Sequence, residues 1–135
     1  MQKARLLFAT LSLLALCSTL PACGDDDDEG LTEAQRHGVG AACDDDSDCY
    51  VGDLELTCLP FKGGYCGLEG CAGDEECPPG SACVAHEDGQ NYCFLVCREK
   101  VECNPTRPLE IESNCSSNIS FVDGKKGDKA CVPPS

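Results

Sequence analysis

The residues best able to carry chemistry in this 135-residue chain are its 14 cysteines. Cysteine side chains form disulfides, bind zinc, exchange electrons or accept a covalent group. Structural zinc sites favour C-x2-C or C-x4-C pairs with histidine in register, and thiol redox sites favour C-x2-C. The short gaps here, Cys66-x4-Cys71 and Cys93-x3-Cys97, join larger groups of cysteines. The spacing therefore predicts disulfides, with no metal and no other cofactor.

Twelve of the cysteines fall into three groups of four, and each group opens with C-x5-C and carries an acid just before its second cysteine. The first two groups also place a tyrosine directly before the fourth cysteine, whereas the third group has longer loops and Ala130 there. A divergent last copy is typical of a repeat array. The repeat defines module one (residues 43–66, with Cys43, Cys49, Cys58 and Cys66), module two (71–93, with Cys71, Cys77, Cys83 and Cys93) and module three (97–131, with Cys97, Cys103, Cys115 and Cys131).

Composition indicates that disulfides, more than a core, hold the fold. Tryptophan is absent and aromatic residues make up only 5% of the chain, so little apolar surface is available to offset the entropy of ordering the backbone. A disulfide adds about 2–4 kcal/mol by restricting the unfolded chain. We therefore predict a small disulfide-rich fold of three short hairpin or loop modules, with little regular secondary structure and no large hydrophobic core.

Turn residues divide the modules into short strand candidates. The strands are expected at Leu54–Leu59, Ala82–Ala85, Tyr92–Val96 and Ile119–Val122. The turns are expected at Gly52-Asp53, Gly63-Gly64, Pro78-Pro79-Gly80, Asp88-Gly89 and Asp123-Gly124. Each module would then contain one or two antiparallel hairpins. Since four cysteines can pair in three ways, the repeat leaves three pairings open in each module.

The N-terminus is typical of an exported protein. Two basic residues precede an apolar run from Leu6 to Leu20, which is shorter than the roughly 20 residues of a membrane-spanning helix and fits a secretory signal peptide. The sequence Leu20-Pro21-Ala22-Cys23 resembles the bacterial lipobox. That resemblance implies a signal peptide over residues 1–22, cleavage before Cys23, a diacylglycerol on the Cys23 thiol and further acylation, for example with palmitate. Loss of Cys17 and lipidation of Cys23 leave twelve cysteines, an even number.

Residues 23–42 are predicted to be the lipidated cysteine followed by a flexible acidic tether. The run Asp25–Glu29 repels itself and favours an extended chain. Thr32 and Gln35 have capping-box spacing, which predicts one or two helical turns over Leu31–His37. A calcium site on the aspartate run is the alternative, although the spaced ligands and turn glycine of such sites are missing.

The C-x5-C rhythm with its preceding acid resembles the Dickkopf N-terminal type of cysteine-rich module, and the lipobox with an aspartate tether is similar to small cysteine-rich lipoproteins of myxobacteria. The resemblance covers residues 43–97 well and 97–131 poorly. It implies that the first cysteine pairs with the third and the second with the fourth: Cys43–Cys58, Cys49–Cys66, Cys71–Cys83, Cys77–Cys93, Cys97–Cys115 and Cys103–Cys131. It implies no Wnt-pathway function, because no receptor-binding motif is matched.

The net charge and the two histidines argue against several classes of function. A formal net charge of −14 disfavours binding to nucleic acid and to anionic lipid headgroups, which both need a basic face. His37 and His86 lack a sequence context in which a nucleophile and an orienting acid would converge, so we interpret them as solvated and the chain as not an enzyme. Membrane contact is then expected only through the lipid.

We expect a lipoprotein of the cell envelope, at the outer membrane and outside the cytoplasm, that displays a binding or structural module to an unknown protein partner. Phe94-Leu95-Val96 and Leu59-Pro60-Phe61 are candidate interface runs, with local packing as the favoured alternative. The second hypothesis is a hydrolase inhibitor, in which the loop Ser116–Ala130 presents Lys125 and Lys126 to a protease.

Overall fold

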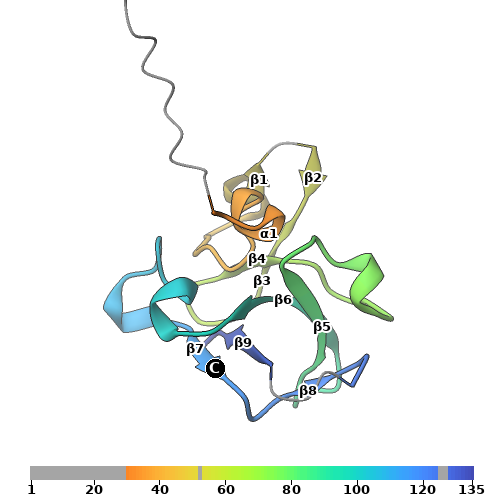
Figure 1. Cartoon of the computed structure of the whole chain (residues 1–135). Helices are drawn as coiled ribbons and strands as arrows, with labels where there is room; N and C mark the ends of the chain where they lie inside the picture. The colour runs from red at the N-terminus through yellow and green to blue at the C-terminus, as the bar shows by residue number, and fades with distance from the viewer. Residues whose placement is uncertain (1–29, 52, 125–127) are drawn as a thin grey trace, which may run out of the picture.

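The computed structural model describes residues 30–51, 53–124 and 128–135 (Figure 1). The predicted signal peptide, Cys23, the aspartate run and the pair Lys125–Lys126 lie outside the described residues. Within these three ranges, no helix is both long enough and apolar enough to cross a bilayer.

Short elements make up the described chain, as expected for a small disulfide-rich fold. The helical segments are α1 (Glu33–Arg36) and the 3-10 helices η1 (Asp46–Cys49), η2 (Asp74–Glu76), η3 (Lys100–Cys103) and η4 (Leu109–Ile111). The strands are β1 (Tyr50–Val51), β2 (Leu54–Glu55), β3 (Thr57–Leu59), β4 (Tyr65–Gly67), β5 (Ser81–Ala85), β6 (Asn91–Cys97), β7 (Asn114–Ser116), β8 (Ser120–Phe121) and β9 (Lys129–Val132). The predicted strand candidates correspond to β2 with β3, β5, β6 and β8, whereas β1, β4, β7 and β9 were not predicted.

Two disulfides in each module tie one helical turn to two neighbouring strands. The third and fourth cysteines of every module are direct partners across an antiparallel pair: β3 with β4, β5 with β6, and β7 with β9. The first and second cysteines flank or end the 3-10 turn. The disulfides join first to third and second to fourth cysteines, as the Dickkopf resemblance implies: Cys43–Cys58, Cys49–Cys66, Cys71–Cys83, Cys77–Cys93, Cys97–Cys115 and Cys103–Cys131.

The acid before each second cysteine accepts backbone hydrogen bonds at the start of its own 3-10 turn, and in modules one and three it completes a capping box. The carboxylate of Asp48 accepts hydrogen bonds from the backbone N–H groups of Asp44 and Asp45. In module two Glu76 accepts from Ala72, and in module three Glu102 accepts from Arg98 and Glu99. Side-chain oxygens satisfy the unpaired N–H groups at a helix start in this way. The acid shared by the three hexads is therefore a structural signature, and module three keeps it despite its longer loops.

Modules two and three are fused by a common sheet. Strand β6 contains both Cys93 and Cys97, so it runs through the predicted boundary between the two modules. It pairs with β5 on one side and with β9 on the other, giving the strand order β7-β9-β6-β5-β8 (Figure 1). Phe94 and Leu95, between the last cysteine of module two and the first cysteine of module three, are 0% and 2% exposed. The predicted strand at Tyr92–Val96 is therefore confirmed, and it lies at the centre of the sheet.

The second half of the predicted tether is part of the folded body. Thr32 and Gln35 form the expected capping box around α1, but Ala34 and Val39 are fully or nearly buried. The backbone N–H of Ala34 donates to the carbonyl of Pro79 at 2.8 Å, and residues 40 and 41 exchange hydrogen bonds with the backbone of Cys66. Residues 31–42 therefore contact both module one and module two, and they are not a flexible tether.

One small cluster of buried side chains draws on every part of the described chain, and many of its members are half-cystines. The N-terminal segment contributes Ala34 and Val39, and the modules contribute Cys43, Cys49, Leu56, Leu59, Tyr65, Cys66, Val84, Tyr92, Phe94, Leu95, Cys97, Cys103, Ala130 and Cys131. A second group contains only the cystines of module two. The core is small, as expected, and the three modules share it.

Protonation of the capping acids is expected to weaken the fold. The pKa of Glu102 lies below its ordinary value of 4.5 because the N–H groups of Arg98 and Glu99 donate to the carboxylate. Its contribution to stability is thus present above pH 4.5 and is lost as pH falls through the lower folded-state pKa. Glu102→Ala should lower the free energy of unfolding by about 1 kcal/mol at pH 7, and by less at pH 3, in denaturant titrations. Glu87→Ala, at an exposed position, is the control, and a pH-independent difference would contradict the capping role.

Two glycines in the left-handed region should respond very differently to alanine. Gly64 has a φ of +66°, and a Cβ there would overlap the carbonyl oxygen of Cys43. Gly89 has a φ of +88° with open space around the Cβ position. Gly89→Ala should therefore cost only the backbone strain, about 1 kcal/mol. Gly64→Ala should cost several times more and reduce the yield of the six-disulfide form, measured by thiol titration after oxidative refolding. Equal yields for the two variants would show that the turn at Gly64 tolerates a side chain.

Candidate functional site

The loop of module three between Cys103 and Cys115 is longer than the corresponding loops of modules one and two. Eleven residues separate these cysteines, compared with eight between Cys49 and Cys58 in module one and five at the same place in module two. The extra chain folds back on itself and includes the 3-10 helix η4. We call residues 104–113 the clamped loop, because side-chain hydrogen bonds join its two ends to each other and its middle to the rest of the fold.

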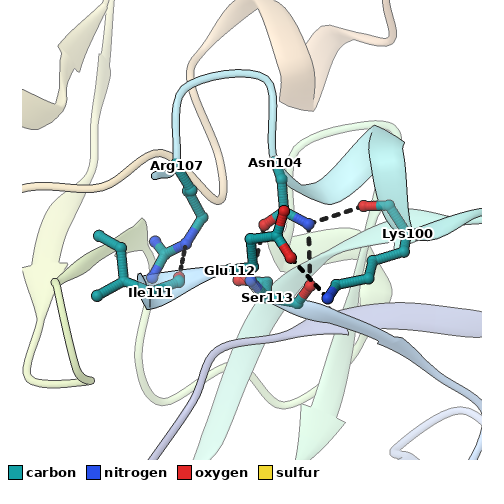
Figure 2. Close-up of polar contacts among 6 residues, drawn as sticks. All are labelled: Lys100, Asn104, Arg107, Ile111, Glu112 and Ser113. Atoms are coloured by element: carbon teal, nitrogen blue, oxygen red, sulfur yellow. Dashed lines mark hydrogen bonds and ion pairs between the residues drawn. The ribbon is translucent and has the colours of Figure 1, made fainter. Parts of the chain in front are cut away.

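The side chain of Asn104 closes the base of the clamped loop (Figure 2). Its Nδ2 donates to the carbonyl oxygens of Lys100, at 2.8 Å, and Ser113, at 3.0 Å, while its Oδ1 accepts from the N–H of Ser113 at 2.7 Å. One amide thus joins the last turn of η3 to the residue that leads into β7. Lys100 and Glu112 add an ion pair of 2.6 Å across the same base. That pair is solvent-accessible, so it contributes little energy and mainly neutralises Lys100.

Arg107 fastens the clamped loop to the rest of the fold from beneath. Its side chain is 5% exposed, and every hydrogen bond it makes goes to a backbone carbonyl. Nε donates to Ile111 within the loop at 2.8 Å (Figure 2). The terminal nitrogens donate to three carbonyls outside module three, those of Gly40, Gly64 and Lys62, at 3.3, 2.8 and 3.2 Å. A single guanidinium therefore joins module three, module one and the N-terminal segment.

Among the described residues, no carboxylate forms an ion pair with the buried guanidinium of Arg107. Burial lowers the pKa of its guanidinium, but an arginine stays protonated near neutral pH. Four carbonyl dipoles and the ring of Tyr65, whose centroid lies 5.9 Å from Cζ, compensate the charge. The Tyr65 hydroxyl accepts a hydrogen bond from the N–H of Leu95 in β6, at 3.1 Å. Arg107 is thereby linked through Tyr65 to the central strand.

The outer face of the clamped loop exposes an apolar side chain. Leu109 is 81% exposed, more than any other large hydrophobic residue in the described ranges. It stands at the start of η4, between Pro108 and Glu110, which are also exposed. The loop therefore combines a hydrogen-bonded backbone with a leucine side chain that is largely exposed to solvent.

His86 is not the solvated loop residue that the sequence suggested. Its side chain is 15% exposed, and its Nδ1 lies 3.2 Å from an Asp88 carboxylate oxygen. The same oxygen accepts a 2.9 Å hydrogen bond from the Tyr92 hydroxyl. The imidazole packs edge-on against Phe61 and Phe94, with ring centroids 5.3 and 6.0 Å apart. The solvated interpretation is wrong because β5 and β6 fold this loop back over an aromatic cluster that local sequence does not reveal.

Asp88 lies at ion-pair distance from His86, but none of the described residues supplies a nucleophile to it. Within the described part of the chain, no serine, threonine or cysteine side chain hydrogen-bonds to His86. Nucleophilic catalysis needs such a partner in reach. The N–H of Gln90 and the Tyr92 hydroxyl lower the pKa of Asp88, while burial and Asp88 raise the pKa of Tyr92 to about 12.

His86 also borders a surface groove of about 420 Å³ lined by Val84, Ala85, Glu87, Asn118, Ile119, Ser120 and Val132.

The two apolar runs predicted as interfaces are mostly internal. Phe94 and Leu95 belong to the buried centre of the sheet, and Leu59 is 2% exposed. Phe61 lies at the centre of the aromatic cluster and contacts Tyr65, Tyr92, Phe94 and His86. The packing alternative is therefore confirmed for these runs. The proposed inhibitory loop is divided between β8, a turn and β9, and since its two lysines lie outside the described residues, its inhibitory role stays a prediction.

Cysteine sulfur atoms gather closely in every module. The sulfurs of the first, second and fourth cysteines lie within 4.8 Å of one another, in the sets Cys43-Cys49-Cys66, Cys71-Cys77-Cys93 and Cys97-Cys103-Cys131. Each of these sulfurs belongs to a disulfide. Metal ligation needs a thiolate, and these sulfurs are oxidised. Each set therefore marks two neighbouring disulfides of one module. Their proximity explains how two disulfides can replace a core inside one module.

Comparison of the chain with protein-family models, with curated proteins and with solved structures finds no match. Any functional assignment therefore rests on the residues and geometry described above.

Removal of the buried guanidinium should loosen the clamped loop. Arg107→Met keeps much of the side-chain length but leaves the four carbonyls without their donors, so we expect a loss of about 3 kcal/mol in the free energy of unfolding. Hydrogen exchange in residues 104–113 should accelerate in the same variant. Arg98→Met removes an exposed arginine of the same module and should change stability by less than about 0.5 kcal/mol. If both variants unfold at the same denaturant concentration, Arg107 does not hold the loop.

Proposed function

We propose that this chain is a lipid-anchored protein outside the cytoplasm that displays a rigid disulfide-stapled module for binding another protein. Cys23 would carry the lipid after removal of residues 1–22. The proposal includes location in the bacterial cell envelope, at the outer membrane, with no catalytic activity.

The pairing of all twelve module cysteines with one another carries the proposal. Six disulfides persist only in an oxidising compartment, which supports export. They also leave Cys17 and Cys23 as the cysteines without a part in the stapled fold. Cys17 lies in the predicted signal peptide, so Cys23 is free to take a lipid in the lipobox-like sequence.

Binding is favoured over catalysis because the structure anchors an exposed loop. The clamped loop, which Asn104 and Arg107 anchor, exposes a leucine, and among the described residues no nucleophilic side chain hydrogen-bonds to His86. A module that exposes a fixed loop at the end of an acidic tether is suited to contact with a partner, since little conformational entropy is lost when a rigid loop binds.

The test is the intact mass of the full chain, expressed in a bacterium with lipoprotein processing and extracted from its membranes. We expect a diacylated or triacylated chain that begins at Cys23, and a gain of twelve hydrogens on reduction of the six disulfides. Two or more acyl chains give lasting membrane attachment, so the protein should remain with the membrane after a high-salt wash.

Cys23→Ser is the decisive variant and Cys17→Ser its matched control. The first should lose both the acyl mass and the membrane attachment, while the second should keep them. An unacylated chain that begins at residue 23, or free thiols among the module cysteines, would overturn the proposal.

A further inference from the structure

We propose that the clamped loop is the binding surface of this protein, and that Leu109 inserts into an apolar pocket of a partner protein whose rim is basic. The inference rests on the proposed function, because it assigns the surface through which the displayed module binds.

Leu109 differs from other exposed apolar residues in the loop that carries it. Isolated apolar residues are common on protein surfaces, so what sets Leu109 apart is how the backbone around it is held. Here an inserted loop is held by the Asn104 amide, the Lys100–Glu112 ion pair and the Arg107 guanidinium, and its apex is a leucine that is 81% exposed. The contacts fix the backbone on both sides of Leu109 and leave its side chain uncovered.

A fixed loop with one apolar side chain is a pre-organised anchor. Burial of a leucine in a partner's pocket contributes about tenfold or more to affinity. Because the loop backbone is already ordered, little of that gain is lost to ordering on binding. Pro108 precedes the anchor and restricts the backbone further.

The charges of the loop specify the rim of the pocket. Lys100 is neutralised by Glu112, and the charge of Arg107 is buried among carbonyls. Glu110 is exposed and forms no ion pair among the described residues. The unpaired charge beside Leu109 is therefore negative, as is the chain as a whole at −14. A basic rim complements it and steers association.

The conformation of the loop excludes strand-like recognition. Residues 109–111 form a 3-10 turn closed by the N–H of Ile111 and the carbonyl of Pro108, at 3.0 Å. A partner that adds a peptide strand to a sheet edge needs an extended segment with free backbone groups. The clamped loop offers a single projecting side chain instead, which fits a pocket.

The experiment is site-specific photo-crosslinking with the full-length protein in its native cells. A benzophenone side chain replaces exposed Thr106, on the clamped loop, or exposed Asn118, on the groove beside His86. We expect one discrete adduct from position 106 and none from position 118. Leu109→Asp should reduce the adduct about tenfold, Leu109→Met should retain it, and Glu110→Lys should reduce it severalfold. Thiol titration checks that each variant keeps its six disulfides.

Each contrary result contradicts a different part of the proposal. An adduct from position 118 alone, or the same adduct from both positions, overturns the assignment of the loop and leaves the proposed binding function standing. An adduct that survives Leu109→Asp overturns the role of Leu109 as the anchor. An unchanged adduct in Glu110→Lys overturns the basic rim. The absence of an adduct at both positions overturns the loop assignment together with the proposed binding function.

Discussion

Two disulfides that join one helical turn to a pair of adjacent strands are the constraint on which this molecule depends. In every module the third and fourth cysteines lie opposite each other on antiparallel strands, and the first two reach them from a carboxylate-capped 3-10 turn. Four half-cystines thereby occupy the space that a chain of ordinary composition fills with aliphatic side chains. The covalent bonds restrict the unfolded ensemble, so strands of two to seven residues are stable although their hydrogen bonds alone would not hold them.

The modules are joined by a shared sheet, a shared aromatic cluster and the carbonyls around Arg107, and no single module forms any of these alone. Strand β6 carries cysteines of both module two and module three, and it places Phe94 where the aromatic rings of module one can pack on it. Arg107 supplies donors to carbonyls from three segments. Its buried charge is favourable only while those carbonyls surround it, so this one residue couples the placement of the N-terminal segment, module one and the loop of module three.

Module three differs from the other two in a longer loop that is anchored to the rest of the fold. The repeat unit needs only a short connection between its second and third cysteines, as module two shows with five residues. Module three has a longer connection that is anchored through Asn104 and Arg107, and the anchoring adds to the fold while it leaves Leu109 uncovered. Loops on a rigid scaffold are common places for binding residues. The features that the three modules share serve the scaffold, and the proposed binding role rests on the loop in which module three departs from them.

The sequence by itself determined the cysteine groups with the acid before each second cysteine, the turn glycines among the described residues and the small disulfide-rich class, because these follow from local spacing and backbone chemistry. It also predicted the capping box of Thr32 and Gln35. Only the tertiary structure decided that residues 31–42 pack into the fold, that the predicted strand through Phe94 and Leu95 lies at the centre of a five-stranded sheet, that His86 joins an aromatic cluster and that Arg107 is buried. These features depend on contacts between residues up to 67 positions apart in the chain, as in the Arg107–Gly40 hydrogen bond. A charged side chain in an exposed-looking loop gives no local sign that distant carbonyls will surround it.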